Sequence, residues 1–488
     1  MLFNSFEYLI FLPTIFILFV ICPKKIRWLL LLLASYTFYI SWNPIYIVLL
    51  FISTLTDYIS SKTIYNSSNN IKKYCFLFFS ISINIGLLAF FKYYNFIIYN
   101  INFLISKLNI NYNIPESNII IPLGISFYTF QTLSYTLDVF LTKKKPENNL
   151  GYFALYVSFF PQLIAGPIER AQNLLPQLKN NLKLNSNNII QGLKIMSWGF
   201  FKKLVIADRL DMFIGLVYSD VTRITTPLYS IATIFFTFQL YCDFSAYSDI
   251  AIGSAKLFNI NLMKNFNRPF ASKSITELWR RWHISLSTWL RDYVYTIFAI
   301  NLRKLGKLGI LIAIFLTFFL SGLWHGASWK FVIMGLMHGF YIIFEYLFWK
   351  IICLSKSLKN ILSTKYFYPL RIIYTNVLFM LSLIFFRANT TKDALYIIQN
   401  LTKDLKSLLI PSYAKSLYNY FVFSQYHFSI AILGIILILI LQFFPFKNLK
   451  HWFYKQNIII RFSFYYIYIM SIVIFGIFSG NTFIYFNF

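Results

Sequence analysis

The sequence predicts an all-α integral membrane protein that crosses the bilayer many times. Of its 488 residues, 58% are hydrophobic and 12% are charged, whereas soluble domains are typically about 25% charged. Uncharged apolar runs recur along the whole chain, and no tract resembles a soluble domain. We therefore expect one membrane domain over residues 1–488, with N-terminal helices in 1–118, a central core in 119–349, and C-terminal helices and a tail in 350–488.

The first two apolar runs, 8–22 and 28–42, are separated only by a basic turn. Because no small-residue cleavage site follows the first run, the pair predicts an uncleaved hairpin and not a signal peptide. Further spans are expected at 45–59, 75–91, 96–108, 119–140, 151–168, 189–207, 228–257, 308–323, 331–349, 368–386, 428–444 and 458–478. Some runs are short, long or bent, so we expect roughly 11–13 membrane helices, with re-entrant or interfacial segments.

The charge and cysteine content exclude several classes of protein. The net charge is +28, from 44 Lys and Arg against 16 Asp and Glu. In so apolar a chain, retention of basic loops on the cytoplasmic side explains this charge better than nucleic-acid binding does. The four cysteines are scattered without a C-x-x-C pair, which indicates neither a disulfide framework nor a metal site.

His325 follows an uncharged run, 308–320, within the short polar sequence SGLWHG. An ionisable side chain at this depth is costly unless it faces protein or water, so it is a functional candidate. In one helix from Leu308, His325 would lie about 26 Å along the axis, beyond the middle of the bilayer. The alternative is an interfacial histidine bonded to a carbonyl group, with Trp324 as part of an aromatic belt.

Polar side chains in two further spans favour an interior that lipid does not reach. Gln131 lies in the span 119–140, and Asp243, Ser245 and Asp249 lie in the span 228–257. Such groups normally face a helix bundle or a wet cavity. Hydrogen bonds between helices explain the neutral side chains equally well. Each aspartate, however, requires a partner of its own.

The stretch 256–307 holds ten Lys or Arg residues and two acidic residues, which predicts a cytoplasmic location. Thr276 could cap a helix whose Trp and Leu residues recur every three or four positions. His283 would lie inside that helix. An amphipathic helix on anionic lipid is the alternative interpretation. A tunnel from this stretch to His325 would cross the membrane.

Six motifs, in order, resemble the membrane-bound O-acyltransferase (MBOAT) family, in particular its AlgI/PatA branch. They are FFPQLIAGPIE (159–169), WGFFKKLVIAD (198–208), YCDFSAYSD (241–249), NRPF (267–270), WRRWHIS (279–285) and SGLWHG (321–326). The resemblance covers nearly the whole chain and implies the MBOAT fold around a tunnel. It also implies that His325 is the catalytic histidine and that His283 is the second signature histidine.

The same resemblance implies a bacterial inner-membrane enzyme that takes acetyl from cytoplasmic acetyl-CoA for O-acetylation of a glycan outside. Peptidoglycan is the first acceptor we expect, and an exopolysaccharide such as alginate is the second. The partner would be a periplasmic acetyltransferase or the glycan itself. Because the donor is anionic, Arg280, Arg281 and Lys273, with Trp282 beside them, are the expected donor contacts. We expect no metal.

Two other function classes are compatible with a polytopic chain. A transporter or flippase also buries polar groups, but such proteins usually contain inverted repeats, and none is visible here. A membrane scaffold for a partner enzyme would leave His283 and His325 unexplained.

The chain end stays aromatic to Phe488, although termini are usually polar and frayed. One interpretation is an aromatic belt that anchors the last span at the interface. The other is that Phe483, Tyr485 and Phe488 resemble the short C-terminal tyrosine motif of MBOAT cell-wall systems. That resemblance implies that Phe483 and Phe488 pack in an apolar groove while the Tyr485 hydroxyl points towards His325 and carries the acyl group.

Overall fold

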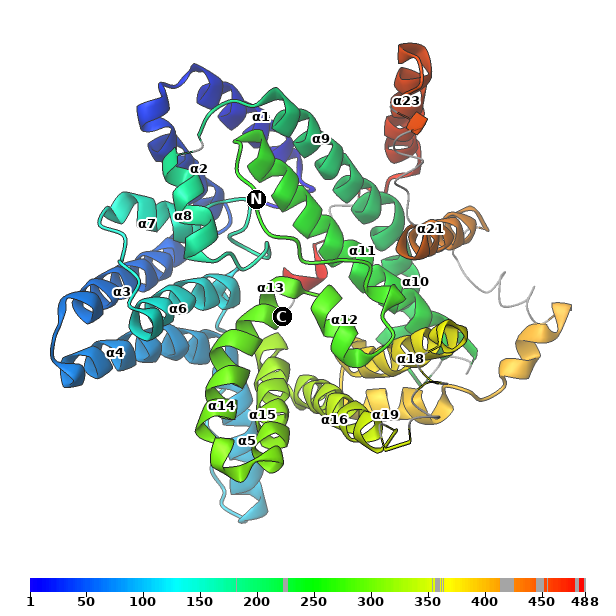
Figure 1. Cartoon of the computed structure of the whole chain (residues 1–488). Helices are drawn as coiled ribbons and strands as arrows, with labels where there is room; N and C mark the ends of the chain where they lie inside the picture. The colour runs from blue at the N-terminus through cyan, green and yellow to red at the C-terminus, as the bar shows by residue number, and fades with distance from the viewer. Residues whose placement is uncertain are drawn as a thin grey trace.

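Helices make up all the regular secondary structure in the described part of the chain, as the computed structural model in Figure 1 shows. The model describes residues 1–180, 182–222, 227–352, 354–355, 360, 362, 364–412, 425–444, 452–453, 455–478 and 482–486. The first ten α-helices are α1 (Phe6–Ile21), α2 (Arg27–Ile40), α3 (Ile47–Asn66), α4 (Asn70–Leu88), α5 (Tyr94–Lys107), α6 (Ile125–Thr142), α7 (Leu150–Ser158), α8 (Ala171–Asn180), α9 (Ser186–Phe200) and α10 (Asp208–Ser219).

The remaining α-helices carry most of the candidate site. They are α11 (Pro227–Leu257), α12 (Ile275–Arg281), α13 (Ile284–Leu290), α14 (Thr296–Asn301), α15 (Lys307–His325), α16 (Trp329–Ile352), α18 (Tyr368–Arg387), α19 (Thr391–Asn400), α21 (Gln425–Phe443) and α23 (Ile458–Phe475). Three π-helical segments also matter, η3 (Ala89–Tyr93), η4 (Phe201–Ala207) and η6 (Arg291–Tyr295), and the tail ends in a short 3-10 turn, η10 (Ile484–Phe486).

Seven helical segments in the described ranges are long and apolar enough to cross a membrane, and α1 is a shorter apolar helix. This finding confirms an all-α, multi-pass membrane protein. The expected total of 11–13 membrane helices stays a prediction. The runs 75–91 and 96–108, expected as two spans, form one continuous segment, Asn70–Lys107, because η3 joins α4 to α5 without a loop.

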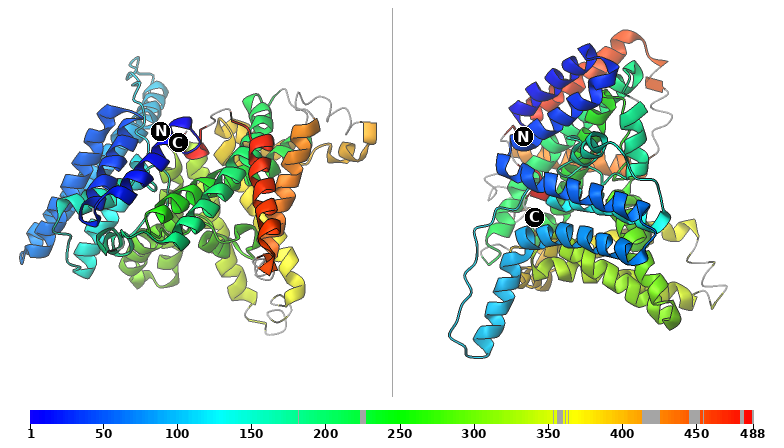
Figure 2. Two further views of the ribbon diagram at one scale, coloured as in Figure 1. Left: turned by 90° about the horizontal axis from the view of Figure 1, so that it is seen from above. Right: turned by 90° about the vertical axis from the view of Figure 1, so that its left-hand side faces the viewer.

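The polar helices α6 and α11 lie inside the bundle, where most of their residues are buried. The N-terminal helices and the pair α21 and α23 lie on opposite sides of α11 (Figures 1 and 2). From α23 the chain returns to the centre, where its red end lies beside α11 and α13 (Figure 1). Buried apolar side chains form two clusters, and Tyr485 in the tail packs against both.

Candidate active site

The last turn of α15 carries His325 and is fixed by two neighbouring residues of η3. The buried Lys92 Nζ donates to the carbonyl oxygens of Trp324 (2.6 Å) and His325 (3.4 Å). The Tyr93 hydroxyl donates to the carbonyl of Leu323 (2.5 Å). The last carbonyls of a helix have no partners within the helix, and a cation there interacts favourably with the helix dipole. These contacts therefore fix the backbone that presents the imidazole.

The helix expected around His283 is interrupted, so one prediction was wrong. The Ser274 hydroxyl, and not that of Thr276, caps α12 by accepting from the Glu277 N–H (3.0 Å). α12 ends at Arg281, and His283 is the residue that precedes α13. The regular spacing of tryptophans continues across a break that periodicity alone does not reveal.

The break places His283 in the left-handed conformation, with φ 43° and ψ 53°. Non-glycine residues adopt this conformation at an energetic cost, and they keep it where the surrounding structure imposes it. Here Asn265 imposes it from the preceding loop. Its carbonyl accepts from the Ile284 N–H (2.9 Å), and its side-chain oxygen accepts from the Ser285 N–H (3.3 Å).

The rings of four predicted site residues lie together at the centre of the bundle. The Tyr485 ring centroid is 6.2 Å from that of His283 and 6.3 Å from that of His325. Trp324 lies 5.8 Å from His283 and 5.0 Å from His325. Phe244, on α11, contacts both Tyr485 (4.1 Å) and His283 (4.6 Å). The ring of the tail tyrosine therefore lies close to both histidine rings.

The electrostatic environment of this cluster favours neutral side chains. His283 is fully buried, and among the described residues neither of its ring nitrogens has a hydrogen-bond partner. Burial, and secondarily the nearby His325, lowers the pKa of His283 well below its usual value. Burial, and secondarily Asp243, raises the pKa of Tyr485. The site thus combines a neutral imidazole, which can accept a proton, with a protonated phenol.

Each of the two aspartates in α11 has the partner that it requires. Lys203 Nζ lies 2.8 Å from Asp243 Oδ1. Lys202 Nζ lies 2.8 Å from Asp249 Oδ2 and donates to the Ser245 hydroxyl (2.6 Å). Sequence reasoning did not single out these lysines, although two adjacent cations inside the apolar run 189–207 are a signal of interior charge.

Two adjoining cavities lie beside the Lys202 pair. They have volumes of about 380 and 390 Å³ and share Trp198, Tyr241 and Phe266 in their walls. Basic side chains of Lys194, Lys202, Lys264 and Arg268 contribute to one or the other. The Phe266 ring contacts Phe244 at 5.2 Å. Phe244 therefore contacts both the wall of these cavities and the rings of His283 and Tyr485.

The expected donor contacts, which lie on α12 and just before it, are not in the walls of these two cavities. Arg281 pairs with Glu277 (2.7 Å), Lys273 Nζ lies 3.5 Å from the centroid of the Tyr368 ring, and Arg280 is exposed. None of these three basic residues lines a cavity described above. Their role as donor contacts stays a prediction.

Two further predicted residues lie in the packed core. Trp282 is buried and contacts Phe379 with centroids 4.9 Å apart. Gln131 is buried in α6 and donates to the carbonyl of Tyr156 (2.6 Å). Both side chains support neighbouring elements, and neither joins the cluster around Tyr485.

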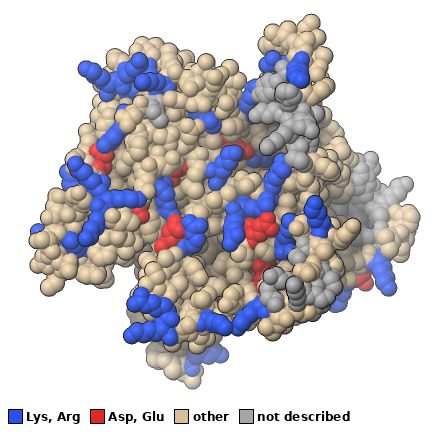
Figure 3. Space-filling model, in the orientation of Figure 1, with Lys and Arg blue, Asp and Glu red and all other residues tan. Residues whose placement is uncertain are grey.

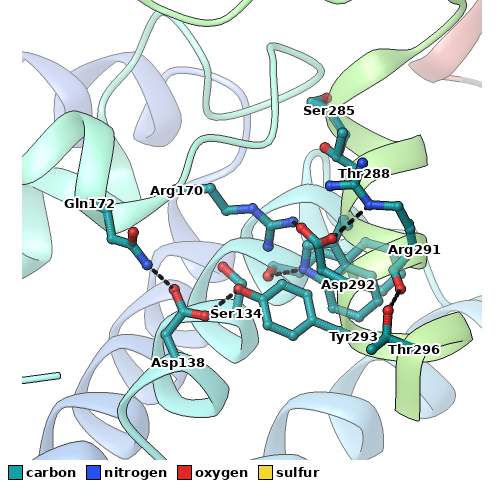
Figure 4. Close-up of polar contacts among 12 residues, drawn as sticks. Ser134, Asp138, Arg170, Gln172, Ser285, Thr288, Arg291, Asp292, Tyr293 and Thr296 are labelled. Atoms are coloured by element: carbon teal, nitrogen blue, oxygen red, sulfur yellow. Dashed lines mark hydrogen bonds and ion pairs between the residues drawn. The ribbon is translucent and has the colours of Figure 1, made fainter. Parts of the chain in front are cut away.

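A polar network holds the segment that follows α13 (Figure 4). Asp138 of α6 accepts from the Tyr293 hydroxyl (2.6 Å) and from the Gln172 amide (2.9 Å). Asp292 pairs with Arg170 (3.3 Å). These contacts connect η6 to α6 and α8, and so hold the helix that begins directly after His283.

His338 and His427, the other two histidines among the described residues, each lie within hydrogen-bond distance of another side chain. His338 Nε2 and the Ser382 hydroxyl are 2.9 Å apart, and His427 Nδ1 accepts from Arg209 (3.2 Å). His451 and Phe488 lie outside the described residues. Within the described ranges, no group of three His, Cys, Asp or Glu side chains could hold a metal ion.

Comparison with known proteins places this site in a family. Residues 143–384, which include both histidines of the cluster, match the membrane-bound O-acyltransferase (MBOAT) family. A peptidoglycan O-acetyltransferase of Helicobacter pylori is 38% identical over 335 residues, which span 63% of this chain and 62% of that relative, less than two thirds of its length. A probable alginate O-acetylase AlgI of Azotobacter vinelandii is 36% identical over 400 residues, 80% of this chain and 75% of that relative. A teichoic acid D-alanyltransferase of Bacillus subtilis is 31% identical over 237 residues, 46% of this chain and 58% of that relative.

Proposed function

The chain belongs to the membrane-bound O-acyltransferase family and is a multi-pass acyltransferase, and we propose that it moves acetyl from cytoplasmic acetyl-CoA across the bacterial inner membrane to a glycan outside. Peptidoglycan is the proposed acceptor, in line with the Helicobacter pylori relative, and an exopolysaccharide such as alginate is the alternative. Because the chain belongs to an enzyme family, we no longer favour the two alternative functions, a transporter and a membrane scaffold.

The closeness of the Tyr485 ring to both His283 and His325 is the observation that carries the proposal. A phenol is a poor nucleophile unless a base lies beside it. In the first step, an imidazole takes the phenol proton, the Tyr485 oxygen bonds to the acetyl carbon, and the carbon–sulfur bond breaks to release the thiol of CoA, which takes up the proton. In the second step, an acceptor hydroxyl attacks the acetyl-tyrosine, and Tyr485 regains its proton.

Loop charges support a direction for this transfer. α15 begins at a basic turn and ends at His325, while α6 begins at Ile125 and ends at Thr142, directly before the lysines 143–145. Basic loops favour the cytoplasm, so His325 and the start of α6 would both lie on the outer side. A small cavity of about 30 Å³ there is lined by residues 121–127, Ile164, Tyr485 and Phe486. The acceptor would approach Tyr485 through this cavity.

The cavities beside Lys202 support binding of an anionic donor on the opposite side. Lys and Arg greatly outnumber Asp and Glu on the face that carries α12 (Figure 3). Phosphate groups pair well with such cations, and Trp198, Tyr241 and Phe266 offer ring faces on which an adenine base could stack. We propose Lys202, Lys264 and Arg268 as donor contacts, with Arg280, Arg281 and Lys273 as further contacts on the same face. Since Tyr485 packs against both apolar clusters, residues 1–488 are proposed to act as one domain.

The test uses a strain that lacks the native protein and expresses either wild type or a variant at a matched membrane level. His325→Ala and Tyr485→Phe should each reduce O-acetyl groups on muropeptides to background, because each removes one reacting group. Phe478→Leu is the control, since Phe478 is 65% exposed. Normal muropeptide acetylation with Tyr485→Phe would contradict the carrier role. Loss of acetyl from secreted polysaccharide alone would favour the alternative acceptor.

A further inference from the structure

A buried cluster of one lysine and two carboxylates lies directly beneath the tail. Lys203 Nζ, on η4, is 2.8 Å from Asp208 Oδ1 and 2.8 Å from Asp243 Oδ1. The three side chains are at most 3% exposed. Removing charges from water is expensive, and additional hydrogen bonds must satisfy the atoms that the ion pairs leave unpaired.

Two of those additional bonds go to the backbone of the tail. Lys203 Nζ donates to the carbonyl of Thr482 (3.1 Å), and Asp243 Oδ2 accepts from the Ile484 N–H (2.7 Å). Between these contacts lies Phe483, whose ring centroid is 4.4 Å from Lys203 Nζ and 5.0 Å from the Tyr247 ring. The cluster therefore binds the tail on both sides of a buried aromatic residue.

These contacts decide between the two interpretations of the aromatic tail. A belt at the lipid interface would leave its rings on the surface, as at Phe478, which is 65% exposed. Phe483 is 1% exposed. Residues 482–486 of the tail thus lie within the bundle, attached through the main chain to charges that lipid would not tolerate.

We propose that Lys203 and Asp243 form a clamp that holds the tail and so positions the Tyr485 ring close to both His283 and His325. Ile484, whose N–H the clamp binds, begins η10, and Tyr485 is the next residue of that turn. Lys203 and Asp243 are positioning residues, because their described contacts reach the tail and not the two imidazoles. The functional part of this inference rests on the proposed function, whereas the attachment of the tail does not.

The clamp is tested by the exposure of a cysteine introduced at Phe486. In the purified full-length protein, labelling of Phe486→Cys by a maleimide is followed on the C-terminal peptide by mass spectrometry. Ile484→Pro removes the N–H bound by Asp243, at the first position of a helical turn, where proline is tolerated. Its matched control is Ile484→Val, which retains the N–H. Lys203→Met removes the cation and leaves the tail sequence unchanged.

Ile484→Pro and Lys203→Met should each accelerate labelling by about ten- to hundredfold, the effect of losing one hydrogen bond to a charged group. Ile484→Val should label like the parent. Acetylation of Tyr485 should fall in parallel with the increase in labelling. An unchanged labelling rate in Ile484→Pro would refute the clamp. If Lys203→Met does not accumulate in the membrane, the labelling of Ile484→Pro alone tests the clamp. Normal glycan acetylation by Tyr485→Phe would refute the carrier role and leave the labelling result valid.

Discussion

Replacement of Phe483 by alanine tests whether the tail is docked inside the bundle or lies on its surface. The Phe483 ring is 1% exposed and contacts both Lys203 and Tyr247. Truncation of a buried phenylalanine typically costs about 3–5 kcal/mol. Since the tail is a chain end, this cost should fall mainly on its docking and not on the fold of the bundle. At about 3 kcal/mol, the ratio of docked to undocked tail falls by roughly 150-fold.

The assay measures acetyl transfer by purified variants together with their thermal stability. The rate of acetyl transfer by Phe483→Ala should fall at least about tenfold. The fall in rate is smaller than the roughly 150-fold fall in the docking ratio if the wild-type tail is almost always docked, because part of the variant's tail then stays docked. The unfolding temperature of the bundle should change little. Phe478→Ala provides the matched control, because it removes the same ring from a position that is 65% exposed. Wild-type transfer by Phe483→Ala would refute the argument that the docked tail takes part in catalysis.

Three further predictions concern the donor side and the second histidine. Lys202→Met should raise KM for acetyl-CoA about tenfold at nearly constant kcat, since one charged contact to the donor is lost; an unchanged KM would remove Lys202 from the donor site. His283→Ala should lower kcat by about a hundredfold or more if the imidazole moves a proton, and a normal kcat would make His283 a packing residue. A cysteine at Lys273 should react with an impermeant maleimide only from the cytoplasmic side; labelling from outside would reverse the topology and the direction of transfer.

The sequence predicts the fold class correctly, but it does not reveal where helices continue or are interrupted. Composition and apolar runs predict the membrane helices because the bilayer imposes length and hydrophobicity on each span. Composition does not reveal that 75–91 and 96–108 form one segment, because Lys92 interrupts the apolar sequence, whereas in the structure it lies within the continuous helical segment and binds the Trp324 carbonyl. The break at His283 is equally hard to detect from the sequence, since Asn265, in the loop between α11 and α12, imposes it.

For the candidate site, too, the sequence predicts some features and does not reveal others. His325, His283 and Tyr485 were predicted through resemblance to family motifs, which also implied that Tyr485 points towards His325. The closeness of His283 to Tyr485 required the structure. The need of Asp243 and Asp249 for partners was predicted correctly, because a buried carboxylate without a partner is costly. The identity of those partners was missed: Lys203 and Lys202 lie on a π-helical segment, where the positions of side chains depart from ordinary helical spacing.

The most direct test of the account is the mass of the C-terminal peptide after the purified enzyme meets isotope-labelled acetyl-CoA. If Tyr485 carries the acetyl group, its peptide should gain a labelled acetyl group that is absent from His325→Ala and that disappears when a glycan acceptor is added. Release of CoA together with acetylated glycan, while the Tyr485 peptide stays unlabelled at every time point and labelled acetyl is found on His325 instead, would contradict it.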